Sequence, residues 1–210
     1  DEAVAAGFNT LVIELGEGFR YASEPRVGAA WALDAGQLTP ILDHARRQGL
    51  DVVPLVPCLT HCRHVLRAAG TRGLGETSLY DPEHAGNLRV MRNLLGEACE
   101  VFRPRWLHVV FAGHVAWACQ QVRALGCRPM MWADALLDPV QFSDSCFFQS
   151  GCYGGSPDRL SQCAALLPRD VLMCDWHYEP AREYPTIRWL AEQGFDVVGA
   201  SRFPRNSFLF

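Results

Sequence analysis

The sequence predicts a (β/α)8 TIM barrel, and three observations support that fold class. Strand and helix signals alternate along the 210 residues. Each strand is a continuous apolar run, as is typical of parallel strands that are buried on both faces. No G-x-G-x-x-G follows the first strand, which weakens the runner-up, a doubly wound open sheet that binds a dinucleotide. Because a full barrel needs roughly 250 residues, we expect this one to be incomplete at its C-terminal end.

Six continuous apolar runs are the predicted strands. They cover residues 10–14, 51–56, 106–111, 128–134, 170–176 and 195–201, and residues 77–82 could supply one further short strand.

Helices are predicted between these strands from helical spacing and glycine stops. They cover residues 39–49, 81–102, 115–126, 158–168 and 184–194. The second is the longest, with an apolar stripe that includes Met91, Leu95 and Phe102. We also expect a long rim loop over 136–157, which its glycines could make mobile. Residues 1–9 resemble the tail of a helix entering a strand, so residues 1–210 are interpreted as one domain within a longer protein.

Composition restricts the class of function. Hydrophobic residues make up 49% and charged residues 20%, with a net charge of -4, so neither nucleic acid nor an anionic membrane is an expected partner. All 19 basic residues are arginine, which excludes Schiff-base chemistry and a P-loop lysine, and no cofactor is predicted. No signal peptide or apolar run of about 18 residues is present. Nine scattered cysteines indicate mostly reduced, buried thiols and a cytoplasmic setting.

Candidate site residues follow the predicted strands, because barrel sites gather at the C-terminal ends of strands. Aromatic rings beside acids suit a sugar, since the rings stack on its C–H faces and the acids bind its hydroxyls. The alternative for each ring is ordinary packing. The strand ends carry Glu14, Glu17, Cys58, His61, His64, Gly113, His114, Trp132, Asp134, Asp175, Trp176, His177, Tyr178, Glu179, Pro204 and Arg205.

Two other site chemistries remain open. The segment CLTHCRH at 58–64 holds four soft or imidazole ligands, but its spacing matches no established zinc pattern. A metal-dependent barrel hydrolase using His61, His64 and Asp134 is therefore an alternative, although we predict no metal. A Cys–His nucleophile is a further alternative, but buried structural cysteine is the commoner outcome.

Seven stretches, in this order, resemble the catalytic barrel of glycoside hydrolase family 20, the β-N-acetylhexosaminidases, and most of all its bacterial, hexosaminidase-D-like branch. They are GFNTLVIE, DVVPLVPCLTHCRHVL, SLYDPEHAGNLRVMRNLLGEACEVF, WLHVV, RPMMWAD, DWHYEP and GFDVVGAS. The resemblance implies a glycosidase in which the substrate's acetamide attacks its own anomeric carbon. It also implies that Trp132 and Trp176 wall the sugar and Tyr178 holds the acetamide oxygen. His61 and Asp134 would line the site, and Glu14 would lie near the sugar hydroxyls. His177, which follows the predicted strand at 170–176, is a further predicted substrate-binding residue.

The family's Asp–Glu pair, expected in a motif like H-x-G-x-D-E, does not carry over. With His108 as the motif histidine the pair falls on Ala112 and Gly113, and with the register set by Val115 it falls on Gly113 and His114. No Asp or Glu lies between Glu100 and Asp134. Three hypotheses follow: a hydrolase whose acid is His114, Glu179 or Asp175, an inactive carbohydrate-binding pseudoenzyme, or an altered segment of an active enzyme.

Overall fold

The computed structural model describes residues 2–58, 61–74, 79–109, 115–137, 142, 164–177 and 182–201. The chain divides into two compact units, Asp1–Pro129 and Met130–Phe210. None of the helices in the described ranges is long and apolar enough to span a membrane.

Unit 1 contains three parallel strands in chain order. Strand β1 (Thr10–Glu14) pairs with β2 (Asp51–Val56), and β2 pairs with β3 (Trp106–Val109). The short helix α1 (Glu2–Ala5) precedes β1, as the N-terminal residues predicted. All of β2 except Asp51 is buried, as expected for a strand inside a parallel sheet.

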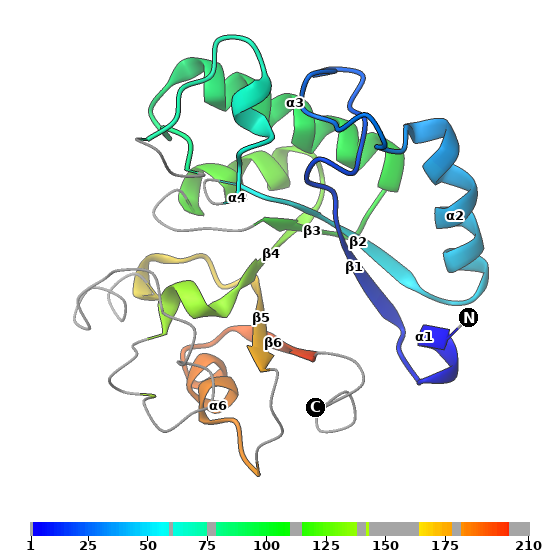
Figure 1. Ribbon diagram of the computed structural model, residues 1–210. Coiled ribbons are helices and arrows are strands. Elements are labelled where there is room, and N and C mark those ends of the chain that lie inside the picture. The colour runs from blue at the N-terminus through cyan, green and yellow to red at the C-terminus, as the bar shows by residue number, and fades with distance from the viewer. Residues whose placement is uncertain are drawn as a thin grey trace. The chain divides into compact units, whose positions relative to one another are not determined.

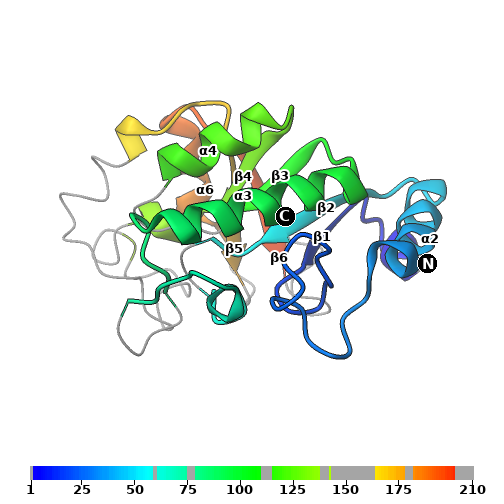
Figure 2. The same ribbon diagram turned by 90° about the horizontal axis from the view of Figure 1, so that it is seen from above.

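Helices α2 (Ala35–Arg47) and α3 (Ala85–Phe102) both contact β2, and they flank it in Figure 1. Helix α2 begins four residues before the predicted start, because Asp34 and Gln37 form a capping box that fixes the N-terminus there. Helix α4 (Val115–Ala124) packs beside α3, as Figure 2 shows from above.

The buried stripe of α3 is the core of unit 1. It contains the predicted Met91, Leu95 and Phe102, all fully buried, together with Val90, Leu94 and Ala98. The helix ends at Arg103, which adopts a left-handed conformation with φ 43° and closes the last turn through its N–H on the Cys99 carbonyl.

Unit 2 contains β5 (Leu172–His177) and β6 (Asp196–Ser201), which pair in parallel, and β4 (Arg128–Trp132), which crosses the unit boundary and pairs with β5 from Met130 onward. Helix α6 (Pro185–Glu192) contacts β5 and β6, and proline at its first position suits a helix start. The 3-10 helices η1 (Val65–Arg67) and η2 (Ala133–Leu136) follow β2 and β4.

These are six parallel strands of an incomplete (β/α)8 barrel, as predicted. Much of the predicted helix at 158–168 and of the rim loop at 136–157 lies outside the described residues. Within the described part of the possible strand at 77–82, residues 79–82, Tyr80 forms an isolated bridge with Gly73. Six cysteines lie in the described ranges, all as free thiols, and five of them are buried.

Candidate functional site

The loop after β1, residues 15–34, is fastened to one face of α3. The Glu97 carboxylate accepts hydrogen bonds from Ala22 N (2.6 Å), Ser23 N (2.9 Å) and Ser23 Oγ (2.6 Å). Glu24 is buried and accepts from Arg89 (2.5 Å) and Asn93 (2.9 Å). Residues 89, 93 and 97 are four apart and therefore share one helix face. The sequence of α3 thus holds the loop at the C-terminal end of β1 in one conformation.

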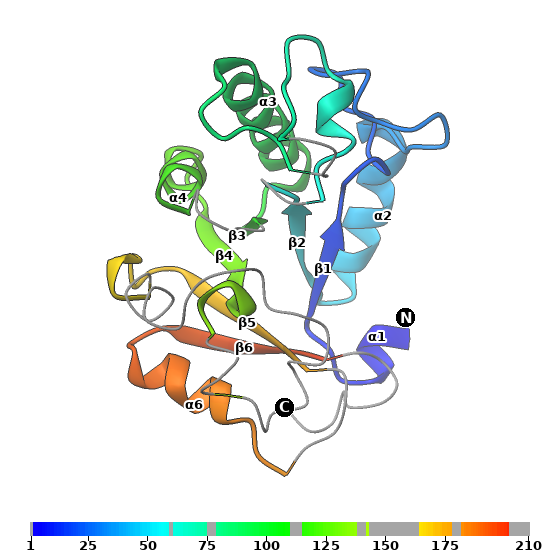
Figure 3. The same ribbon diagram turned by 60° about the vertical axis from the view of Figure 1, so that its left-hand side comes forward.

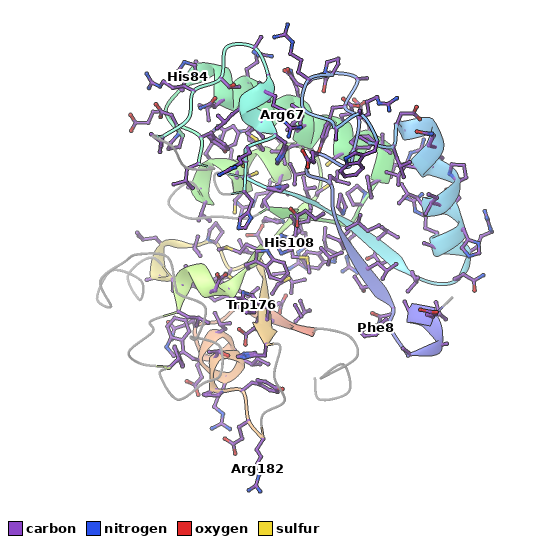
Figure 4. All side chains as sticks on the ribbon, viewed as in Figure 1. Phe8, Arg67, His84, His108, Trp176 and Arg182 are labelled. Carbon is purple, nitrogen blue, oxygen red and sulfur yellow. The ribbon has the colours of Figure 1, made fainter. Side chains whose placement is uncertain are left out.

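Glu14 and His108 point to the same side of the unit 1 sheet. Both are in register with Leu55, Glu14 through the β1–β2 pairing and His108 through β2–β3, and registered residues of parallel strands share a face. Glu14 is exposed at the end of β1, where it can accept hydrogen bonds from a ligand. His108, labelled in Figure 4, is fully buried, and burial lowers its pKa to about 3, so its imidazole is neutral.

The residues after β2 separate into a buried and an exposed set. Cys58 and Cys62 are fully buried, and burial raises the pKa of both thiols, which makes them poor nucleophiles. His64 is buried, and burial, assisted by Arg67, lowers its pKa to about 4. His61 is exposed and left-handed, with φ 58°, a conformation that is uncommon outside glycine. His61, the histidine predicted to line the site, is therefore exposed, whereas His64 is buried.

No three His, Cys, Asp or Glu side chains in the described part of the chain are gathered so that they could hold a metal ion. The metal-dependent alternative thus gains no support from the described positions of His61 and His64.

Glu17 and Arg67 join the two loops of unit 1. The Arg67 guanidinium donates to Glu17 Oε2 at 2.6 Å, and both side chains remain nearly half exposed. The loop after β1 and the segment carrying η1 lie side by side in Figures 1 and 3. A charged pair thus lies at the C-terminal ends of β1 and β2.

In unit 2, Trp132 and Trp176 share one side of the sheet. Trp132 is in register with Cys174, and Trp176 lies two residues further along β5, so both rings project from the same face. Both side chains are partly exposed, and Asp134 follows in η2, also partly exposed. Figure 4 labels Trp176 on β5. The two predicted sugar-walling tryptophans are therefore brought to a common face.

Asp175 and His177 point to the opposite side of β5, toward α6. Thr186 of α6 donates to Asp175 Oδ2 at 2.6 Å, and His177 Nε2 lies 3.0 Å from both Asp175 Oδ2 and Thr186 Oγ1. All three side chains are buried. Because a catalytic acid has to reach the substrate, this geometry favours a packing role for Asp175 and for His177.

Six of the candidate site residues lie outside the described residues: Gly113, His114, Tyr178, Glu179, Pro204 and Arg205. Two features of the site region were missed in the sequence. Trp31 is 69% exposed in the loop after β1, and Thr186 completes the buried cluster beneath α6. Neither residue lies at a predicted strand end, and candidate site residues were predicted only at those ends.

Comparison with known proteins shows likeness only at the level of structure. No family model matches the sequence, and no curated protein sequence matches it. A β-N-acetylhexosaminidase from Bacteroides fragilis NCTC 9343 aligns over 97% of this chain with a TM-score of 0.69 and 15% identity. A mutant β-hexosaminidase from Streptomyces plicatus, in complex with product (GlcNAc), aligns over 96% with a TM-score of 0.64 and 15% identity.

A third solved structure, the GH20 exo-β-N-acetylglucosaminidase from Vibrio harveyi in complex with N-acetylglucosamine, aligns over 94% of this chain with a TM-score of 0.62 and 14% identity. The chain spans 46%, 43% and 37% of the lengths of these three proteins, respectively. At such identities the likeness concerns the fold, and the chain has the fold of part of the glycoside hydrolase family 20 catalytic barrel.

Proposed function

We propose that this chain recognises terminal N-acetylhexosamine as a glycosidase of β-N-acetylhexosaminidase type. The observation that carries the proposal is the common face of Trp132 and Trp176, two partly exposed rings that suit the C–H surfaces of a pyranose. The fold supports it, since two of the similar structures hold GlcNAc or N-acetylglucosamine.

The substrate's 2-acetamido oxygen would attack its own anomeric carbon, as the family resemblance implies. The leaving group would still need a proton, so one side chain has to act as general acid. The burial of Asp175 against α6 leaves His114 and Glu179 as the better of the three predicted acids. The family resemblance further implies a contact between the sugar hydroxyls and Glu14, which is exposed at the end of β1. It also implies His61, Asp134 and Tyr178 as substrate-binding residues.

A second function, carbohydrate binding without hydrolysis, is favoured by one observation. The chain has no Asp or Glu between Glu100 and Asp134, where the family resemblance expects its catalytic pair. General acid catalysis contributes typically about 10²–10⁴-fold, and acetamide positioning adds to it. A protein without that pair would hydrolyse little and could still bind sugar through its tryptophans.

Hydrolysis of 4-nitrophenyl N-acetyl-β-glucosaminide and binding of N-acetylglucosamine test both functions. The hydrolase predicts turnover that falls at least tenfold in Glu179→Gln or His114→Gln. The binding protein predicts no turnover but a sugar affinity that Trp132→Ala and Trp176→Ala both weaken. Leu166→Ala, which alters an 84% exposed side chain of unit 2, is the control.

The double substitution Gly113→Asp/His114→Glu adds the missing pair in one register, and a gain of turnover would support descent from an active site. Absence of both turnover and sugar binding in the folded parent would contradict both functions.

A further inference from the structure

Trp31 is a large aromatic surface that the proposed site leaves unexplained. Its side chain is 69% exposed, and it is the only aromatic among the strongly exposed large hydrophobic residues of the described ranges. Leaving an indole in water forgoes the favourable transfer that burial would give. A single exposed aliphatic residue needs no explanation, but an exposed tryptophan at the ligand-binding end of a barrel strand indicates a contact surface.

The loop presents Trp31 on a rigid base. Four side chains of the loop are buried, namely Phe19, Tyr21, Val27 and Ala32. The rings of Phe19 and Tyr21 pack edge to face, with their centroids 4.7 Å apart. Backbone hydrogen bonds join Leu33 N to Gly18 O (3.0 Å) and Ala29 N to Glu17 O (2.8 Å). The three hydrogen bonds accepted by the Glu97 carboxylate of α3 hold the same loop. The backbone of the loop that carries Trp31 is therefore held in place before any ligand arrives, which lowers the entropy cost of ordering the loop on binding.

Gly18 fixes the position of the ring. A Cβ at residue 18 would lie 3.4 Å from Cζ3 and 3.6 Å from Cη2 of Trp31, so the benzene half of the indole rests on the glycine backbone. With that support on one side and 69% of the side chain in solvent, the rest of the ring is available to a flat apolar partner.

The glycine that supports this ring is preceded by a charged residue. Glu17 precedes Gly18, and its carboxylate is paired with Arg67 at 2.6 Å, with side-chain exposures of 43% and 47%. A carboxylate can accept hydrogen bonds from sugar hydroxyls. A guanidinium group can donate hydrogen bonds to sugar hydroxyls and to the acetamide carbonyl. An aromatic face in the same loop as such a pair would match a pyranose, which has C–H groups on its faces and hydroxyls around its rim.

We propose that Trp31, Glu17 and Arg67 form a second sugar-binding site, which takes a pyranose ring of an N-acetylhexosamine oligosaccharide. This rests on the proposed function, and it adds a second site for a sugar residue, which lies in unit 1. The site lies wholly within unit 1 and is distinct from the Trp132 and Trp176 face of unit 2.

Calorimetric titration of the full chain with N-acetylglucosamine and with its β-1,4-linked tetramer tests the proposal. We expect the tetramer to bind roughly tenfold more tightly than the monosaccharide, the size of one aromatic contact. Trp31→Ala should abolish that gain and leave the monosaccharide Kd unchanged, whereas Trp31→Phe should keep part of it. Ile41→Ala, which truncates a 52% exposed side chain of α2 in the same unit, should leave the gain intact.

The possible failures are distinguishable. If the monosaccharide binds and the tetramer gains nothing, or if Trp31→Ala keeps the gain, the second site is wrong and the proposed function stands. If neither sugar binds the folded parent, both are wrong. Tetramer binding that Trp31→Ala abolishes, in a protein that does not bind the monosaccharide, would support the second site alone. Far-ultraviolet circular dichroism of each variant shows whether the fold is intact.

Discussion

At the scale of single residues, the alternation of β5 assigns neighbours to different tasks. Asp175 and Trp176 are adjacent, so their side chains leave the strand on opposite faces. Trp176 stays partly exposed with Trp132, while Asp175 is buried with His177 and Thr186 beneath α6. Asp175, which was predicted to act on the sugar, therefore helps to pack α6 against β5, on the face opposite Trp176.

Removing the Thr186 hydroxyl tests that attachment. Thr186→Val keeps the shape of the side chain but leaves Asp175 Oδ2 without its 2.6 Å donor. His177 Nε2 remains 3.0 Å from that oxygen, so the variant loses one of two hydrogen-bond partners of a buried carboxylate. Because a hydrogen bond to a charged group contributes about 1.5–3 kcal/mol, we expect the Tm to fall by roughly 3–10 °C in thermal unfolding. Thr39→Val, which removes the hydroxyl bonded to the Ala35 carbonyl on exposed α2, is the matched control and should change little. Equal Tm values for the two variants would contradict a role for Thr186 in the buried cluster.

At the scale of elements, α3 acts on both of its long faces. One face supplies the apolar core beneath β2, and another supplies Arg89, Asn93 and Glu97, which hold the loop after β1. The loop has no regular secondary structure of its own beyond the bridge between Phe19 and Leu33. Its order therefore depends on side chains of a helix that lies far along the chain.

Loss of the Glu97 carboxylate is expected to loosen this loop without unfolding unit 1. Glu97→Ala removes three hydrogen bonds to Ala22 and Ser23. Arg20 and Arg26 are exposed in the loop, so trypsin can cut there once the loop opens. A loss of only about 1.4 kcal/mol in local stability would raise cleavage roughly tenfold. Glu100→Ala, an exposed position on the same helix, is the control. Cleavage of Glu97→Ala at the parent's rate would show that the loop does not depend on the hydrogen bonds to Glu97.

The sequence predicted the strands better than the ends of the elements. The apolar runs at 10–14 and 51–56 are the observed β1 and β2, because continuous apolar residues leave one solution for a buried parallel strand. The predicted strand at 128–134 ends instead at Trp132, since Asp134 belongs to the 3-10 turn of η2. The predicted start of α2 was wrong because the search for helical spacing ignored the Asp34 and Gln37 cap, which the sequence does contain.

The candidate site was less predictable for a physical reason. Strand ends can be located from apolar runs, so Glu14, Trp132 and Trp176 were identified. Trp31 lies in a loop whose conformation depends on hydrogen bonds with α3. The partners in these bonds are far apart in the sequence, so no local sequence pattern predicts them. The side taken by Asp175 follows from strand alternation, but its use against α6 depends on Thr186, which is eleven residues away.

At the scale of the whole chain, buried histidines link stability to acidity. His64 and His108 are both buried, and their folded pKa values are lowered from 6.5 to about 4 and about 3. Between about pH 6.5 and about pH 4 the unfolded chain therefore binds protons that the folded chain does not. Folded-state stability is fully present above about pH 6.5 and is lost as the pH falls through this window, by up to about 1.4 kcal/mol per pH unit for each histidine.

Replacing these histidines by a residue that does not titrate should flatten that dependence. We expect the Tm of the parent to drop steeply between about pH 7 and about pH 4.5, and the drop to be smaller in His64→Gln and in His108→Gln. The comparison is between slopes, so a lower Tm in either variant at neutral pH, from imperfect packing of the new side chain, does not affect it. His44→Gln, at an exposed position of α2, should follow the parent at every pH. Parallel curves for all four proteins would mean that both imidazoles become protonated as readily in the folded chain as in the unfolded one, and that burial does not keep them neutral.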